Sequence, residues 1–483
     1  MSRSRLPTAA LSYWLRDALD GETARRATVL DMHISADVCI VGGGYTGLWS
    51  AIEIKTARPD LEVVVVERDL CGSGASGRHG GFVLSLWAKF ASLVKTCGED
   101  EAVRLCNASA QAILDLQTFC EANSIDAELR LDGWLWAATS ARQVGTWEPT
   151  LEGIERSGFR PFERLSDQAA AALGGSRAHV AGVFERVSAS VHPAKLARGL
   201  KRHAERLGVK VFENSPMVRL DRGMPAQVHC EAGSVKSAKV ILALNAWAAA
   251  FSEIRKAIVV VSSDVVITRP MPEVLEAIRW TSGMTISDCR MLVHYYRTTP
   301  DGRIVFGKGG GSGAMAYGPH VDRKFDGASP IGPMVAQWLS RIYPAVSAKD
   351  VVQSWTGPID RSRNGLPLFG ALPNDSNIYY GVGYSGNGAG PSMLGGKILR
   401  SLALGLDDEW ARCGLVRPLR RAFPPEPFRY FGGRLVRHAV AQSDRAADEG
   451  RDTGLLVRAL TKLAPAGLSP TRTSGEPSPG SAG

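Results

Sequence analysis

The clearest pattern of hydrophobic and polar positions lies between residues 36 and 81. An apolar, β-rich run over 37–41 predicts a buried parallel strand, and a second run over 61–66 predicts another. Residues 45 to about 58 lie between these runs and predict a helix. A strand, a helix and a strand in this order form a βαβ unit, so we expect an α/β fold.

The pattern continues along most of the chain. Apolar positions at helical spacing predict helices over 100–123 and from Pro193 to about 207. Residues 133–138 predict a strand, and a strand-rich segment from 257 to about 310 contains a hairpin with its turn at Pro300-Asp301-Gly302. Before the βαβ unit, an amphipathic lead-in that we expect to dock on the surface carries Leu11, Trp14, Leu15 and Leu19 at helical spacing.

Three glycines follow the first strand at the spacing of a dinucleotide-binding turn. In this G-x-G-x-x-G motif Gly42 permits a tight turn, Gly44 lets a pyrophosphate touch backbone, and Gly47 lets the helix pack on the strand. Glu67 ends the second strand, where a carboxylate can accept hydrogen bonds from ribose hydroxyls. The motif alone does not distinguish NAD from FAD. The candidate cofactor site here comprises Gly42, Gly43, Gly44, Tyr45, Thr46, Gly47, Glu67 and Arg68.

A loop of small residues, 71–81, comes directly after this acid. Such a loop lets a bulky planar ligand lie against backbone. A nicotinamide enzyme does not need a second glycine run here, whereas a flavin ring and its ribityl chain do. The sequence therefore favours FAD, with further candidate contacts from Gly74, Ala75, Ser76, Arg78, His79, Gly80 and Gly81.

A second glycine-rich block lies about 300 residues later, over 355–367 and 377–388. Together with the two early loops it resembles the D-amino-acid oxidase and glycine oxidase superfamily of FAD-dependent amine oxidases. The resemblance implies a Rossmann-type FAD-binding domain, an interleaved antiparallel-sheet substrate domain, and FAD as the cofactor. It also implies cofactor contacts from Met217, Val218, Asn245, Gly383, Ser385, Gly386, Asn387 and Gly388.

We expect five regions along the chain. The ends are an N-terminal lead-in at 1–35, a C-terminal cap at 406–445, and a tail at 446–483 that is too polar to order from about 465. The resemblance implies a discontinuous FAD-binding domain at 36–90, 190–256 and 350–405, and a substrate domain at 91–189 and 257–349.

The resemblance also implies the reaction. Members oxidise a C–N bond of a small amine by passing a hydride equivalent to flavin N5, and the imine then hydrolyses to an aldehyde and an amine or ammonia. Glycine-oxidase-type members bind an α-carboxylate with two arginines, but this chain has Ile359 and Gly386 at those places. An α-amino-acid substrate is therefore disfavoured.

The late block is closer to gamma-glutamylputrescine oxidoreductases and to proteins described as aminophosphonate oxidoreductases. By this analogy we expect an aminoalkylphosphonate or a similar anionic amine as substrate. Tyr296 and Arg297 are candidates for the substrate pocket, since the matching strands of family members form the wall over the flavin. The sequence is equally consistent with ordinary strand residues at both positions. A gamma-glutamylputrescine-like polyamine derivative and an N-substituted glycine such as iminodiacetate stay open, as does the electron acceptor, O2 or another.

His79 stands where related loops usually carry Asn. Some family members attach flavin through such a histidine, but a hydrogen bond to cofactor or backbone is the simpler role. We expect bound, noncovalent FAD.

Composition changes this picture little. The 483 residues carry a net charge of +9, with a sequence pI near 9.2. The basic residues are scattered, so we expect no nucleic-acid partner, although an RNA-modifying flavoprotein and a flavin electron carrier are the alternatives of other classes. Eight cysteines without a C-x-x-C pair or His cluster predict no metal site and suit the cytoplasm. No apolar run is long enough to predict a membrane span.

Overall fold

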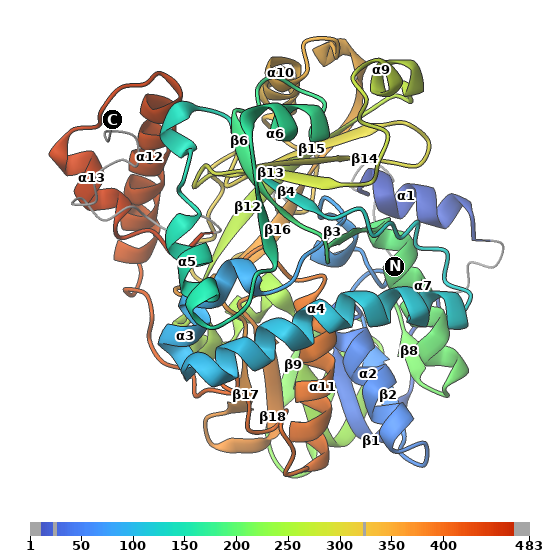
Figure 1. The fold of residues 1–483 in the computed structure, drawn as a ribbon. Coiled ribbons are helices and arrows are strands. Elements are labelled where there is room, and N and C mark those ends of the chain that lie inside the picture. Colours follow the sequence, from blue (N-terminus) through green and yellow to red (C-terminus); the bar gives the residue numbers. More distant parts are fainter. Residues whose placement is uncertain (1–10, 23–26, 322–324, 468–483) are drawn as a thin grey trace.

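The computed structural model describes residues 11–22, 27–321 and 325–467, which form two large sheets with helices around them (Figure 1). The first sheet has the order β17-β18-β11-β1-β2-β8, and β9 and β10 extend from β11. Its strands are β1 (His33–Val41), β2 (Val63–Val66), β8 (Lys210–Phe212), β9 (Met217–Asp221), β10 (Ala226–Cys230), β11 (Ser234–Leu242), β17 (Leu368–Leu372) and β18 (Asp375–Val382).

The centre of the first sheet is parallel, as the βαβ pattern predicts. β1 pairs in parallel with β2 on one side and with β11 on the other, and β8 and β18 continue this direction. The helices α2 (Tyr45–Ala57), α4 (Glu99–Ala122), α7 (Pro193–Arg206) and α11 (Pro391–Leu404) pack together beside it. α2 is buried on nearly all sides, because it lies against both α7 and α11.

The second sheet has the order β16-β12-β15-β14-β13-β4-β6-β5. Its strands are β4 (Trp134–Ala138), β5 (Phe162–Leu165), β6 (Ala181–Glu185), β12 (Ile258–Thr268), β13 (Thr285–Asp288), β14 (His294–Thr298), β15 (Ile304–Gly309) and β16 (Val351–Ser362). The predicted hairpin is β14–β15. The sheet is antiparallel except at one place, because β13 and β4, far apart in the chain, pair in parallel.

One long pairing joins segments that the sequence places in different domains. β16 pairs with β12 from Ile258↔Ser362 to Thr268↔Val351. The predicted FAD-binding segment 350–405 therefore contributes β16 to the second sheet and β17 and β18 to the first. As a result, one continuous stretch of chain passes from one sheet to the other.

The shorter elements cover the two sheets. α9 (Pro272–Ala277), α10 (Gly332–Ile342) and α6 (Asp167–Leu173) lie by the second sheet, at the top of Figure 1. The remaining elements before the C-terminal region are β3 (Phe82–Val83), β7 (Ala189–Ser190), α3 (Phe90–Cys97), α5 (Glu148–Arg156), α8 (Ser252–Arg255), and the 3-10 turns η2 (Ala75–Gly77), η3 (Trp87–Lys89), η4 (Ala141–Gln143), η5 (Asn245–Ala250) and η7 (Ala348–Asp350).

The lead-in forms a short docked helix, α1 (Tyr13–Asp20). The Ser12 side chain caps it by accepting from Leu15 N, and Trp14 and Leu15 are buried. The Ser12 Oγ also donates to the Gly77 carbonyl at 2.6 Å, and the Trp14 indole donates to the His79 carbonyl at 3.0 Å. The lead-in therefore supports the small-residue loop; residues 1–10 and 23–26 lie outside the described residues.

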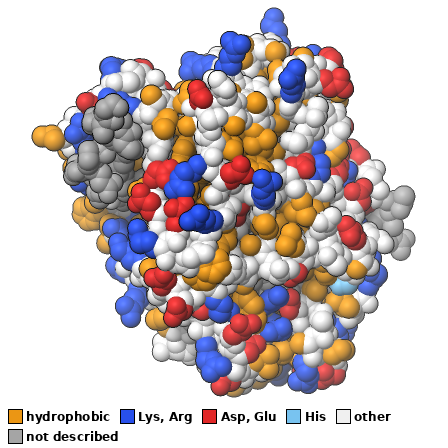
Figure 2. Space-filling view, in the orientation of Figure 1, with side chains coloured by type: hydrophobic (Ala, Val, Ile, Leu, Met, Phe, Trp, Pro, Cys, Tyr) orange, Lys and Arg blue, Asp and Glu red, His pale blue; other side chains and the backbone are white. Residues whose placement is uncertain are grey.

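The C-terminal region forms two helices, α12 (Phe428–Asp448) and α13 (Leu455–Thr461), at the left of Figure 1. α12 continues past the predicted boundary at 445. The predicted disorder from about 465 falls mostly on 468–483, outside the described residues, but residues 465–467 are placed against the body of the protein. None of the helices described here is long and apolar enough to cross a lipid bilayer. Basic and acidic side chains are interspersed on the face seen in Figure 2.

Candidate active site

A cavity of about 470 Å3 is lined by loops of the first sheet and by strands of the second. Both early glycine loops and the late glycine block reach its wall. The predicted cofactor residues on the wall are Gly42, Gly44, Tyr45, Thr46, Glu67, Arg68, Gly74, Ala75, Ser76, Arg78, His79, Gly80, Met217, Asn245, Ser385, Gly386, Asn387 and Gly388. The cavity thus brings together segments that are more than 300 residues apart in the sequence.

The first glycine loop is packed so tightly that backbone itself forms the wall. A Cβ on Gly42, which has φ +113°, would lie 2.4 Å from the Ala243 carbonyl oxygen. A Cβ on Gly47 would lie 2.0 Å from the Gly42 oxygen, as expected for the glycine that lets the helix approach the strand. Ser76 Oγ accepts from Tyr45 N at 2.9 Å, so the second loop covers the first turn of α2.

Glu67 lies at the end of β2, where an acid suits a ribose. Its carboxylate accepts from Gly43 N at 2.7 Å and from Asp69 N at 3.0 Å. Burial nevertheless raises its pKa to about 7, because these hydrogen bonds only partly replace the lost water. Beside it, the Arg68 guanidinium lies over the Trp247 ring, 4.6 Å from the ring centroid.

The second loop is held in place by hydrogen bonds from Arg78. The Arg78 Nε donates to the Ser73 carbonyl at 2.8 Å, and its Nη1 donates to the Thr356 carbonyl of β16 at 3.2 Å. Burial lowers the Arg78 pKa to about 10. This side chain therefore fastens the loop to the second sheet.

Both ring nitrogens of His79 are engaged. Gly81 N donates to Nδ1 at 3.1 Å, so the proton of the neutral ring belongs on Nε2, which lies 3.2 Å from the Tyr45 hydroxyl. Tyr45 in turn donates to the Pro193 carbonyl at 2.8 Å. Burial lowers the His79 pKa to about 3, so the ring is neutral at ordinary pH. This pairing fits a hydrogen-bonding role better than a covalent bond to flavin.

The late glycine block is organised by the buried carboxylate of Asp360. It accepts from Gly383 N at 2.5 Å and from the Asn245 side-chain amide at 3.1 Å. Burial raises its pKa to about 7. Ser385 and Gly386 follow with positive φ values, 58° and 91°, and lead toward α11. Asp360 thus joins η5, β16 and the late block at the cavity wall.

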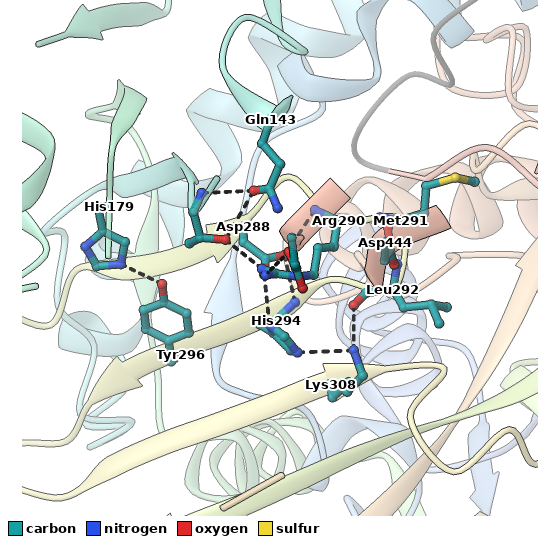
Figure 3. A network of polar contacts seen from close by, with 12 residues as sticks. Gln143, His179, Asp288, Arg290, Met291, Leu292, His294, Tyr296, Lys308 and Asp444 are labelled. Atoms are coloured by element: carbon teal, nitrogen blue, oxygen red, sulfur yellow. Dashed lines mark hydrogen bonds and ion pairs between the residues drawn. The ribbon is translucent and has the colours of Figure 1, made fainter. Parts of the chain in front are cut away.

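The structure does not place Tyr296 or Arg297 on the wall. Tyr296 is fully buried on the face of β14 that points away from the cavity. There its hydroxyl lies 2.6 Å from His179 Nε2 (Figure 3). Arg297 is 1% exposed, and its guanidinium donates to the carbonyls of Gly80, Val191 and Thr298. The assignment of both residues to the pocket is therefore wrong. Tyr296 belongs to the core, and Arg297 holds the small-residue loop by hydrogen bonds.

Five predicted cofactor residues also lie off the wall: Gly43, Gly47, Gly81, Val218 and Gly383. The glycines act one step away, through backbone bonds or close packing. Gly81, with φ +85°, leaves room for the Arg297 guanidinium, 2.4 Å from where a Cβ would lie. The Val218 side chain is 61% exposed, whereas its neighbour Met217 lines the cavity.

Sequence reasoning missed several wall residues of the second sheet. Tyr295 lines the cavity and its hydroxyl lies 2.8 Å from Ser263 Oγ. Arg361 follows Ile359 by two residues along β16, and the period-2 alternation could have placed both on one face. Lys89, at the end of η3, carries no motif that would have marked it.

A buried polar network behind the cavity holds the loop before β14 (Figure 3). Asp288 pairs with Arg290 and with His294, whose Nδ1 lies 2.9 Å from Asp288 Oδ2. Asp444 of α12 accepts from the backbone N–H groups of Met291 and Leu292 at 3.2 and 3.0 Å. Met291 lines the cavity, so the C-terminal helix helps to shape it.

These residues fit FAD. The bare backbone of the first loop suits a pyrophosphate, Glu67 suits a ribose, and the small-residue loop leaves space for a planar ring. The first sheet would hold the dinucleotide, and the second sheet would cover the ring with Ser263, Tyr295 and Ile359.

Comparison with known proteins agrees with this geometry. A family model described as FAD dependent oxidoreductase (DAO) matches residues 37–402. Gamma-glutamylputrescine oxidoreductase of Escherichia coli (strain K12) is 30% identical over 379 residues, which cover 78% of this chain and 85% of that protein. Glycine oxidase from Geobacillus kaustophilus has a similar structure, with a TM-score of 0.64, 20% identity, and coverage of 81% of this chain and 100% of the other. Iminodiacetate oxidase from Chelativorans sp. BNC1 gives a TM-score of 0.59 with 18% identity, over 80% and 99% of the two chains.

Proposed function

Because this chain belongs to the FAD-dependent oxidoreductase (DAO) family, we propose that it oxidises a C–N bond in a small amine that carries an anionic group. The family establishes an FAD-dependent oxidoreductase acting on amines, with the mixed α/β fold that the sequence predicts. Bound FAD would supply the acceptor for a hydride equivalent from the carbon next to nitrogen. Water then hydrolyses the released imine to an aldehyde and an amine or ammonia.

The chain's own residues would bind and orient the reactants. The glycine loops and Glu67 would hold the dinucleotide, and the wall of the second sheet would keep the amine in a space shielded from bulk water. The late block near Asn387 and Gly388 would offer backbone donors to the pyrimidine edge of the ring. We propose noncovalent FAD, since both nitrogens of His79 are engaged.

The charge distribution on the wall carries the proposal of an anionic substrate. Lys89 and Arg361 line the cavity, and neither forms an ion pair within the described part of the chain. The carboxylates among the described wall residues are Glu67 and Asp360, and both already accept hydrogen bonds from backbone N–H groups. A wall with this balance suits an anion better than a free diamine.

Within this class, an aminoalkylphosphonate is our first candidate and a gamma-glutamylputrescine-like compound is the second. The second is favoured by the Escherichia coli relative, whose name states that substrate. An N-substituted glycine such as iminodiacetate stays a third candidate, favoured by similarity to a solved oxidase. A cytoplasmic location, the absence of a nucleic-acid partner and the choice of O2 or another electron acceptor stay predictions.

Anaerobic reduction of the purified holoenzyme tests the proposal. The flavin absorbance at 450 nm is followed with 2-aminoethylphosphonate, its N-methyl form, gamma-glutamylputrescine, putrescine, iminodiacetate, sarcosine and glycine. We expect rapid bleaching by the two aminophosphonates or by gamma-glutamylputrescine, and slow bleaching by putrescine, glycine and sarcosine. Bleaching by glycine or sarcosine alone would contradict the argument from Ile359 and Gly386. No bleaching by any amine would favour a flavin electron carrier, and salt-sensitive RNA retention would favour an RNA-modifying flavoprotein.

A further inference from the structure

Among the residues that the structure describes, Lys89 and Arg361 on the cavity wall donate hydrogen bonds to backbone carbonyls alone. Lys89 is 5% exposed, and its Nζ donates to the Gly467 carbonyl at 2.5 Å. Arg361 donates from Nη2 to the Ala466 carbonyl at 2.8 Å. The Arg361 Nε is buried and has no hydrogen-bond partner among the described residues. A buried guanidinium N–H without a hydrogen-bond acceptor costs free energy, so we expect a ligand to supply an acceptor at this position.

The two carbonyls belong to a segment whose Gly467 lines the cavity. We call residues 465–467 the C-terminal strap. Ala466 N donates to the Arg363 carbonyl at 3.0 Å, so the strap is attached by its own backbone as well as by the two cations. Gly365 makes room for it, since a Cβ there would lie 3.0 Å from the Ala466 oxygen and 3.1 Å from Lys89 Nζ.

The strap also borders a second cavity. This outer cavity, of about 410 Å3, is lined by α12, by the end of α13 and by residues of the second sheet. Both cavities have Met291, Gly310, Arg361 and Gly467 on their walls. The strap and Arg361 therefore belong to the partition between the flavin cavity and the outer cavity.

We propose that Lys89 and Arg361 bind the anionic group of the amine substrate, and that the C-terminal strap occupies this site until that group displaces its two carbonyls. The inference rests on the proposed function. A phosphonate or carboxylate would replace two neutral acceptors with charge-assisted hydrogen bonds, and it could also engage the buried Arg361 Nε. Moving the strap would join the two cavities and open a path beside α12.

The electrostatics agree with an anion at this place. Burial, and then the nearby Arg361 charge, lower the Lys89 pKa to about 7. Neutral carbonyls do not offset two like charges in a buried space, whereas an anion does. Substrate binding thus supplies the countercharge that the described residues do not.

The test uses methylphosphonate, which carries the anion but no amine, titrated calorimetrically into the full-length holoenzyme. We expect Lys89→Met and Arg361→Met each to weaken binding about 10-fold or more, because a charge-assisted hydrogen bond is lost. Ala466→Pro removes the N–H that attaches the strap, and a chain ending at Ala464 lacks the strap altogether; both should bind methylphosphonate several-fold more tightly. Flavin content and thermal unfolding of each variant report its folding.

Arg434→Met is the matched control. Arg434 lines the outer cavity but not the flavin cavity, and its side chain donates a hydrogen bond to the Tyr430 hydroxyl. The control should bind methylphosphonate within about twofold of the wild type, since the lost charge lies outside the proposed site.

Three outcomes would overturn the inference. Unchanged affinity in Lys89→Met or Arg361→Met rules out the anion site, and unchanged or weaker affinity in both strap variants rules out displacement. If methylphosphonate binds neither the wild type nor the shortened chain, both the anion site and the displacement of the strap are ruled out. If amines reduce the flavin while the variants behave as wild type, only this inference fails. If methylphosphonate follows the expected pattern but no amine reduces the flavin, only the proposed function fails.

Discussion

The Nε of Arg297 donates to the Gly80 carbonyl at 2.7 Å, which ties β14 to the small-residue loop. The same guanidinium donates from Nη2 to the Val191 carbonyl at 2.6 Å and lies over Trp14, 5.1 Å from the ring centroid. One buried arginine thus connects the second sheet, the loop beside the flavin cavity and the lead-in helix. These contacts hold the loop in position.

Arg297→Met should therefore affect stability more than substrate binding. We expect the free energy of unfolding to fall by about 3 kcal/mol or more, because three carbonyls lose a charged donor. The fraction that retains FAD should keep its half-saturating amine concentration within about twofold. Chemical denaturation and stopped-flow reduction measure these quantities. Arg186→Met, at an exposed pair with Glu163, is the control and should cost less than 1 kcal/mol. Unchanged stability with much weaker amine binding would restore a substrate role.

FAD should be released intact when the protein is denatured. The Gly81 N–H and the Tyr45 hydroxyl engage both nitrogens of His79, so neither is available for a bond to the flavin. Acid precipitation should leave the yellow colour in the supernatant, and His79→Asn should still bind FAD. A flavin that stays with the precipitated wild type but not with His79→Asn would show a covalent link.

Gly43→Ala should weaken FAD retention. A Cβ at this position would lie 2.4 Å from Cys71 Sγ and 3.1 Å from Glu67 Cβ, so the loop must shift and the carboxylate with it. We expect at least 10-fold weaker FAD binding, measured by equilibrium dialysis of the deflavinated protein. Gly432→Ala, inside α12, is the matched control and should bind FAD normally, since an added Cβ would meet none of the described neighbouring atoms within 4 Å. Equal FAD affinity in both variants would mean that the loop tolerates a side chain.

Glu185 predicts a defined pH dependence of stability. It lies buried on β6 and accepts hydrogen bonds from Ser85 and Ser188, and burial raises its pKa to about 7 from an ordinary 4.5. The folded state therefore favours the protonated form, so the contribution of Glu185 is complete below pH 4.5 and is lost as the pH rises through 7.

Glu185→Gln should remove this dependence, because an amide does not titrate. The stability of the wild type relative to the variant should fall by about 3 kcal/mol between pH 4.5 and 7.5. Urea denaturation of both proteins across this range gives the difference directly. Parallel stability curves for the two proteins would show that Glu185 has an ordinary pKa.

The sequence by itself determined the features that depend on short stretches of chain. The turn at Gly42, the close approach at Gly47 and the acid at Glu67 follow one another at fixed spacing, so a dinucleotide site can be recognised without knowing the fold. The two early loops and the late block also carried enough chemistry to favour FAD. The helices and strands around them follow from local periodicity.

Only the tertiary structure decided which side chains face the cavity. The strand containing Tyr295, Tyr296 and Arg297 is visible in the sequence, but neighbouring residues point to opposite faces, and the pairing of β14 with β13 and β15 sets which face is inside. Lys89 and Arg361 meet the strap through contacts between distant segments. Such contacts depend on how whole elements pack, and no local pattern encodes them.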